Sequence, residues 1–247
     1  MKVLATYNIK GGVGKTATAV NLAYLAAAGG ARTLVWDLDP QGAASFYFRV
    51  KPKVKGGSEA LITGRRALDR AIKGTDYDNL DLIPADFSYR NMDLELGDTK
   101  KRTRRIDLLI RPLAKSYDYV FLDCPPSISL VSENVFRAAN VLLVPLIPTT
   151  LSLRTFDQLD AFLEDNPGRK KQKVMAFFSM VDNRKTLHRE LVEKVTADRK
   201  DVLATQIPAT SDIERMGVYR QPLPAFAPKS RSGKAYAELW DEVVSRL

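Results

Sequence analysis

Lys10-Gly11-Gly12-Val13-Gly14-Lys15-Thr16 is the stretch that decides the fold of this chain. A short apolar run at 3–7 precedes it and an alanine-rich run at 17–28 follows it, so the order is strand, glycine-rich turn and helix. Glycines let successive backbone N–H groups face one anion, and the helix adds the positive end of its dipole. The stretch therefore predicts a phosphate-binding loop; a glycine-rich turn that contains lysine by chance would not explain the strand and helix around it.

Each part of the loop has an expected task. Lys15 is expected to reach the β- and γ-phosphates of ATP, and the Thr16 hydroxyl to ligate Mg²⁺. The common pattern G-x-x-x-x-G-K-[ST] has a glycine where this chain has Ile9, so the loop is a variant with an additional lysine, Lys10, at its start. The expected ATP contacts are Lys10, Gly11, Gly12, Val13, Gly14, Lys15, Thr16, Ala17 and, farther along the chain, Pro208.

Two further apolar strands end in aspartates. Residues 33–39 carry Asp37 and Asp39 to the end of a strand whose near-continuous apolar character predicts cover on both faces. Residues 117–123 end in Asp123, which a proline-stiffened loop follows. Because ligands bind at the carboxyl ends of strands in open α/β sheets, we expect Asp123 to hold Mg²⁺ and Asp39 to orient the attacking water. The alternative is that Asp37 and Asp39 only cap the strand end.

The variant loop resembles that of the deviant Walker ATPases, the family of ParA, MinD, nitrogenase iron protein and arsenite-pump ATPase. DLDPQG at 37–42 and DCPPS at 123–127 are similar to the ParA spellings of these segments. The resemblance implies that Lys10 acts catalytically by reaching across a nucleotide-sandwich homodimer to the partner's phosphates. It further implies that loss of Asp39 blocks hydrolysis and that Asp37 lies near the metal.

The amino-acid composition limits which members of this family the chain can resemble in function. The single cysteine, Cys124, fits a reducing cytosol and disfavours the members that need several cysteines for a cluster or a metalloid. The N-terminus enters strand-like sequence directly and no run approaches eighteen apolar residues, so we expect a cytoplasmic protein without a signal peptide or stable membrane insertion. The net charge of +9 favours a polyanionic partner, nucleic acid first and anionic membrane second.

Alternating strands and helices predict an α/β fold. We expect a mostly parallel sheet with helices on both faces, a P-loop NTPase of the deviant Walker type, with residues 1–247 as one domain. A short strand is expected to end at Ile207-Pro208, a capping box to start a helix at Ser211, and a last helix to cover 236–247. The only histidine, His188, is predicted on the surface.

The expected function is a partitioning or positioning ATPase. It would dimerise with ATP, bind DNA non-specifically near the nucleoid, and position a cargo, either ParB-bound DNA or a protein assembly, through a ParB-like or adaptor protein that stimulates hydrolysis. One alternative is a MinD-like membrane-surface ATPase, although the chain stops at Leu247 inside what reads as a core-packing helix. Another is a metabolic P-loop enzyme that transfers phosphate to a small molecule. The chain begins two residues before its first strand, so we expect a short form without an N-terminal helix-turn-helix domain.

Basic clusters at 169–173, 184–185, 199–200 and 215–234 motivate the DNA prediction. The loop after Pro208 often carries arginines in ParA proteins, but here it reads Ala209-Thr210-Ser211-Asp212. A solvated surface role is the alternative for each basic residue, including the run at 100–105. The candidate DNA contacts are Arg184, Lys185, Arg215 and Arg220.

Overall fold

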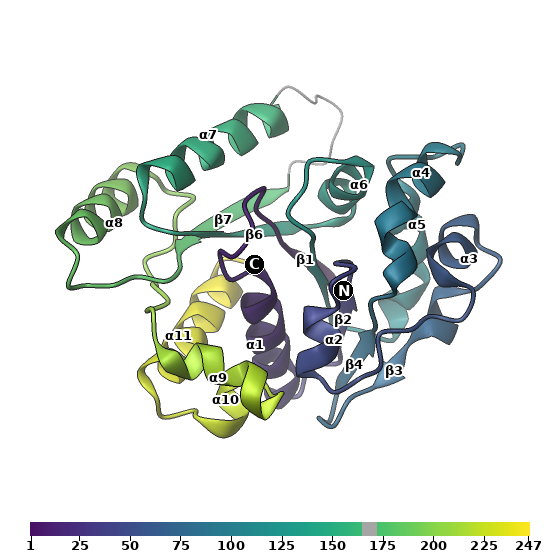
Figure 1. The fold of residues 1–247 in the computed structure, drawn as a ribbon, viewed down its shortest axis with the longest axis horizontal. Coiled ribbons are helices and arrows are strands. Elements are labelled where there is room, and N and C mark those ends of the chain that lie inside the picture. The colour runs from purple at the N-terminus through teal and green to yellow at the C-terminus, as the bar shows by residue number, and fades with distance from the viewer. Residues whose placement is uncertain (165–171) are drawn as a thin grey trace.

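The computed structural model describes residues 1–164 and 172–247. Its strands form one sheet in the order β3-β4-β2-β5-β1-β6-β7, with the N-terminal strand near the centre (Figure 1). All neighbouring pairs are parallel except β3–β4, which is antiparallel at one edge. The strands are β1 (Lys2–Thr6), β2 (Thr33–Asp37), β3 (Lys73–Gly74), β4 (Leu80–Ile83), β5 (Tyr119–Asp123), β6 (Val141–Leu146) and β7 (Lys173–Phe178).

Helices cover both faces of the sheet (Figure 1). One apolar core joins the sheet to α1, α2, α9, α10 and α11, and the other joins it to α3 through α8. Within β2, Leu34 and Trp36 belong to one core and Val35 to the other, which is the period-2 alternation of a strand buried on both sides. The helices are α1 (Lys15–Ala28), α2 (Ala43–Tyr47), α3 (Gly57–Thr63), α4 (Met92–Gly97), α5 (Arg105–Ile110), α6 (Leu130–Ala138), α7 (Thr150–Glu164), α8 (Thr186–Asp198), α9 (Ser211–Tyr219), α10 (Leu223–Phe226) and α11 (Arg231–Ser245).

This architecture confirms the predicted fold class and corrects three local predictions. The strand expected to end at Ile207-Pro208 is wrong, because Val202 and Pro208 each form one isolated bridge, to Ala176 of β7 and to Val181, and no continuous strand joins them. The capping box at Ser211 is also wrong: the helix cap is Thr210, whose hydroxyl instead shares a hydrogen bond of 2.6 Å with Ser232. His188 is buried, not on the surface, and its Nδ1 accepts a hydrogen bond of 3.1 Å from the Asp182 backbone N–H.

The last helix starts five residues earlier than expected. α11 begins at Arg231, and the Ser230 hydroxyl caps it by accepting a hydrogen bond of 3.0 Å from the Gly233 N–H. Its Leu239 and Val243 are fully buried against the sheet, whereas Val244 is exposed. Within residues 1–164 and 172–247, no helix combines the length and apolar character required to cross a bilayer.

Candidate nucleotide site

The glycine-rich loop joins β1 to α1 in a conformation that its sequence explains. Gly12 (φ 72°) and Gly14 (φ 96°) lie in the left-handed region, which glycine adopts without steric cost. A Cβ on Gly14 would come within 2.9 Å of the Ser179 hydroxyl oxygen, so this position also has no room for a side chain. Asn8 anchors the start of the loop, because its side chain accepts from the Lys10 N–H (2.8 Å) and donates to the Pro145 carbonyl (2.8 Å).

Lys15 lies at the first position of α1 with its side chain buried. Its Nζ donates a hydrogen bond of 3.1 Å to the Lys10 carbonyl, which directs the ammonium group back across the loop. Burial lowers the pKa of Lys15, and the nearby acidic groups of Asp123, Cys124 and Asp39 oppose that shift. The result is a buried cation at the base of the loop, without a direct ion pair among the described residues, which suits an incoming phosphate.

A cavity of about 390 Å³ opens over the loop. It brings Lys15, Thr16 and Asp39 together as predicted, and it adds side chains from α2, α9, α11 and the end of β7 that sequence patterns did not single out. Val13 is buried beneath the loop, and Lys10 stands beside the cavity without lining it. The lining residues are Gly11, Gly12, Gly14, Lys15, Thr16, Ala17, Asp39, Ala43, Tyr47, Pro126, Ser179, Met180, Ile213, Glu214 and Tyr236.

Asp37 and Asp123 end neighbouring strands and pair in the parallel register of β2 and β5. Both are fully buried. Asp37 Oδ2 accepts hydrogen bonds of 2.7 Å from both the backbone N–H and the hydroxyl of Ser45, and Asp123 Oδ1 accepts one of 3.4 Å from the Thr6 hydroxyl. The other oxygens, Asp37 Oδ1 and Asp123 Oδ2, have no hydrogen-bond partner in the part of the chain that the structure describes.

The pKa of each of these two carboxyl groups is raised above its usual value. Burial raises the pKa of Asp37 from 3.8 to about 6, against the hydrogen bonds from Ser45. Burial and the adjacent Asp37 raise the pKa of Asp123 well above its usual value, and the Thr16 hydroxyl opposes this. Two buried acids with free oxygens beside a threonine hydroxyl are a donor set that suits a hard cation.

The donor set fits Mg²⁺ bound together with a nucleotide. Among the described residues no group of three or more His, Cys, Asp or Glu side chains could hold a metal ion. Mg²⁺ is commonly held by one or two carboxylates together with water and substrate phosphates, so a complete protein cage is not required. Thr16, Asp123 and Asp37 would supply the protein side of such a site.

Asp39 lies two residues beyond β2 at the edge of the cavity. Its Oδ1 accepts a hydrogen bond of 2.9 Å from the Gln41 N–H, and its carbonyl accepts one of 2.9 Å from the Gly42 N–H. This turn fixes the carboxylate at the cavity and leaves it partly exposed. It is therefore accessible to a water molecule, unlike Asp37.

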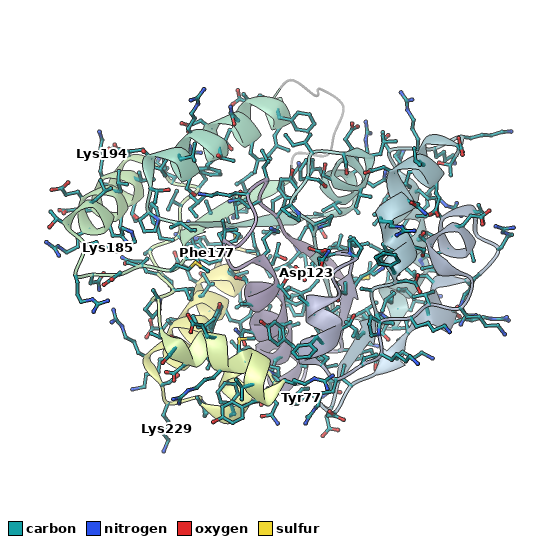
Figure 2. All side chains as sticks on the ribbon, viewed as in Figure 1. Tyr77, Asp123, Phe177, Lys185, Lys194 and Lys229 are labelled. Atoms are coloured by element: carbon teal, nitrogen blue, oxygen red, sulfur yellow. The ribbon has the colours of Figure 1, made fainter. Side chains whose placement is uncertain are left out.

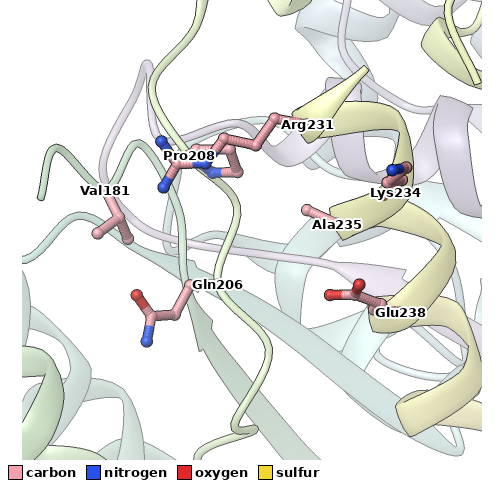
Figure 3. Close-up of a pocket in the computed structure, with 7 residues that line it drawn as sticks. All are labelled: Val181, Gln206, Pro208, Arg231, Lys234, Ala235 and Glu238. Carbon is pink, nitrogen blue, oxygen red and sulfur yellow. The ribbon is translucent and has the colours of Figure 1, made fainter. Parts of the chain in front are cut away.

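Pro208 lies outside the loop cavity. It lines a neighbouring cavity of about 230 Å³ together with Val181 and Gln206 and with residues of α11 (Figure 3). The two cavities are close in the chain, since Met180 lines one and Val181 the other. Arg231 and Lys234 give this second cavity a basic side, which Glu238 partly balances.

The four candidate DNA-binding residues differ in whether their charged groups already interact with other residues of the protein. Arg184 forms an ion pair of 2.9 Å with Asp182, and the Arg220 guanidinium stacks 4.6 Å from the centre of the Phe46 ring while its Nε donates to the Phe46 carbonyl (3.1 Å). Lys185 points outward from the start of α8 (Figure 2), and Arg215 is exposed on α9. Neither has an ion pair within the described part of the chain.

The other basic clusters contribute less than their composition suggested. Arg199 is engaged by Asp157, Asp160 and Asp201, so it is not available to a phosphate. Residues 169–171 of the cluster at 169–173 lie outside the described residues.

The loop, the buried acids and the parallel sheet together define a P-loop nucleotide hydrolase. Residues 1–176 match the family described as an AAA domain. The chain is 33% identical to the chromosome partitioning protein ParA of Caulobacter vibrioides over 256 residues, covering all of this chain and 95% of that protein. It is 31% identical to the sporulation initiation inhibitor protein Soj of Bacillus subtilis, covering 99% of this chain and 98% of that protein. The chain belongs to the ParA/Soj family of P-loop ATPases.

A solved structure supports the fold and was determined with a nucleotide analogue and magnesium bound. Cobyrinic acid a,c-diamide synthase from Mycobacterium smegmatis, with a bound ATP analogue and magnesium, superposes with a TM-score of 0.84 at 28% identity. The match covers all of this chain and 95% of that one. The bound groups in that protein are of the kind that the loop and the free oxygens of Asp37 and Asp123 suit here.

The raised pKa of Asp123 leads to a stability prediction for the ligand-free protein. A buried acid whose pKa rises on folding destabilises the fold where it must ionise, so the penalty is absent below about pH 4 and grows as the pH rises. We expect Asp123→Asn to raise the melting temperature at pH 7.5 by about 3–8 °C. At pH 4 the difference should vanish. Differential scanning calorimetry at both values checks this.

The matched control is Asp118→Asn. Asp118 is exposed and pairs with Arg32, which lowers its pKa to about 2, so its removal should change stability with the opposite sign. With an ATP analogue and Mg²⁺, wild type should gain more stability than Asp123→Asn. A lower melting temperature of ligand-free Asp123→Asn at pH 7.5 would contradict the description of this carboxylate.

Proposed function

We propose that this protein is an ATPase that dimerises with ATP, binds DNA without sequence preference in that state, and positions a cargo. The cargo is DNA bound by a ParB-like protein, or a protein assembly with an adaptor that stimulates hydrolysis. The observation that carries the proposal is the loop cavity with Lys15 inside it and Lys10 beside it, in a chain of the ParA/Soj family. The protein would act in the cytoplasm on the nucleoid.

Different residues of the chain would bind the phosphates, hold the metal ion and orient the attacking water. The loop N–H groups and Lys15 hold the phosphates, and Thr16 with Asp123 and Asp37 holds Mg²⁺. Mg²⁺ held by these residues would supply positive charge to offset that of the nucleotide phosphates. Asp37 is buried and bonded to Ser45 and does not line the cavity, which leaves Asp39 to orient the attacking water.

The edge of the sheet that carries the loop also supports dimerisation. Ile128 follows β5, Leu151 follows β6 and Met180 follows β7, and the three side chains are 53%, 58% and 36% exposed. Carboxyl ends of parallel strands share one edge, so these apolar side chains belong to the same edge of the sheet as the nucleotide cavity, which Met180 lines. A second copy facing this edge would cover them, and Lys10, which does not line its own cavity, would be placed to reach the partner's phosphates.

DNA binding is assigned chiefly to Lys185 and Arg215. Both are exposed, whereas Arg184 shares its charge with Asp182 and Arg220 is held against Phe46. Each subunit alone would make few phosphate contacts and bind weakly. Two subunits joined by ATP double the contacts on one duplex and raise the effective concentration of the second subunit, which tightens binding.

The test is a titration of random-sequence duplex DNA at several salt concentrations, with MgATP and with MgADP. With MgATP, log affinity should fall linearly with log salt concentration. Lys185→Ala and Arg215→Ala should each make this slope shallower, by about 0.9 for every DNA phosphate that the removed side chain neutralised in each subunit. Lys2→Ala is the matched control, because Lys2 is exposed at the other end of β1, where its ammonium donates to the Leu247 carbonyl.

Two outcomes would contradict the proposal. One is equal DNA affinity with MgATP and MgADP, and the other is an affinity that does not depend on salt. ATP-dependent co-sedimentation with anionic vesicles in place of DNA would favour a membrane-surface ATPase.

A further inference from the structure

A third and larger cavity, of about 760 Å³, lies beside β3. Its walls come from the segment that follows α2, from the 3₁₀ turn Leu68–Ala71 and from β3 itself. Figure 1 shows β3 at the edge of the sheet, next to β4. The buried side chains of Val54 and Ala71 form an apolar part of the lining. Six cationic residues complete it: Lys51, Lys53, Lys55, Arg66, Arg70 and Lys73.

The charge of this cavity is unbalanced. No acidic residue lines it, and across residues 1–164 and 172–247 none of its six cations belongs to an ion pair. Neighbouring arginines outside the cavity are paired: Arg49 with Asp76 and Arg65 with Glu59. Like charges gathered around a concave, partly apolar surface repel one another and attract anions. This cavity, which we call the basic cavity, therefore carries unpaired positive charge, whereas the arginines beside it are neutralised by ion pairs.

Arg66 provides a second argument for an anionic ligand, independent of the overall charge of the cavity. Its Nε is buried and has no hydrogen-bond partner among the described residues, while its terminal nitrogen donates to the Arg70 carbonyl. Buried donors are normally satisfied, so this guanidinium nitrogen at the cavity wall is available to an acceptor that binds there. Phosphate oxygens are the acceptors that arginine binds best.

We propose that the basic cavity binds a small, multiply phosphorylated molecule of nucleotide size, at a site separate from the P-loop. Its volume lies within the range of about 300–1,000 Å³ that is typical of small-molecule sites, and its lining combines apolar side chains with cations. A DNA duplex presents a long ridge of phosphates that a cavity of this size does not accommodate. The proposal does not depend on the partitioning function.

Calorimetric titration with inorganic tripolyphosphate tests the site. One equivalent of MgADP fills the P-loop first, because an excess of this diphosphate would compete for the basic cavity as well, and free Mg²⁺ is held constant. The triple variant Lys51→Gln, Lys53→Gln, Lys55→Gln should bind tripolyphosphate at least about tenfold more weakly than wild type. The control, Lys100→Gln with Lys101→Gln and Arg102→Gln, removes the same charge from an exposed run outside the cavity and should change affinity by less than about twofold. Equal losses in both variants would overturn the proposal.

Arg66 and Arg65 give a second matched pair. Arg66→Gln removes the orphaned donor and should weaken binding, whereas Arg65→Gln removes an exposed arginine that is paired with Glu59 and should not. Unchanged affinity of Arg66→Gln would contradict the assignment of this donor to the ligand.

Lysine acylation of the wild-type protein, read by mass spectrometry, needs no variant. Tripolyphosphate should protect Lys51, Lys53, Lys55 and Lys73 and leave Lys100 and Lys101 reactive. Absence of protection would overturn the proposal. Protection by duplex DNA but not by tripolyphosphate would overturn it as well and assign the basic cavity to nucleic acid.

Discussion

Lys15→Ala is expected to weaken MgADP binding by at least about a hundredfold. Lys15 is the buried cation at the base of the loop, and its ammonium already lies 3.1 Å from the Lys10 carbonyl, across the space that phosphates would occupy. Without Lys15, only the uncharged N–H groups of the loop would remain to bind the phosphates. Lys15→Arg should not restore binding, because a planar guanidinium does not replace the compact ammonium group in this buried position.

Titration of a fluorescent ADP analogue measures the effect of Lys15→Ala. Lys2→Ala is again the control, since it removes a lysine at the opposite end of β1. Circular dichroism establishes that both variants are folded. Wild-type affinity in folded Lys15→Ala would show that this loop does not bind nucleotide phosphates.

Asp39→Ala is expected to reduce ATP turnover by about 10²–10⁴-fold while leaving nucleotide affinity within about threefold of wild type. Among the described residues the carboxylate accepts a hydrogen bond from the Gln41 N–H alone, and Asp39 lines the cavity, so its loss removes the group that orients water and little else. Asp123→Asn should differ, because that residue is proposed to hold Mg²⁺. Single-turnover hydrolysis together with ATP binding distinguishes the two variants.

Lys10→Ala should bind nucleotide, as Asp39→Ala does, but the two variants should differ in dimerisation: Asp39→Ala should accumulate as a dimer and Lys10→Ala should not. Lys10 does not line the cavity of its own subunit, so nucleotide should still bind. The dimer should fail to form, because the lysine's proposed phosphate partner lies on the other subunit. The same defect in both variants would remove the support for a nucleotide-sandwich dimer.

The loop and the strand-end acids were predictable because their signals are local. A strand, three glycines, Lys15 and a helix follow one another in the chain, and apolar strands end at Asp37 and Asp123. The remaining cavity wall was not predictable, because Tyr47, Ser179 and Tyr236 arrive from α2, the end of β7 and α11 through tertiary packing. No spacing in the sequence relates these residues.

Burial and pairing of charged residues also depend on packing. His188 reads as a surface residue on a charged helix, yet the helix turns it inward to accept from the Asp182 N–H. Arg199 and Lys185 both lie in basic clusters, but three aspartates engage Arg199 and none of the described residues pairs with Lys185. Charge counted along the chain therefore overstates the basic surface that is free to bind DNA.

The central claim is that ATP joins two copies of this chain through Lys10, and the molar mass in solution tests it most directly. Light scattering with MgATP should give Asp39→Ala twice the 27.5 kDa mass of one chain, and with MgADP the mass of a single chain. Lys10→Ala should keep the mass of a single chain with either nucleotide. A single-chain mass for Asp39→Ala with MgATP, or a dimer of Lys10→Ala, would contradict the account.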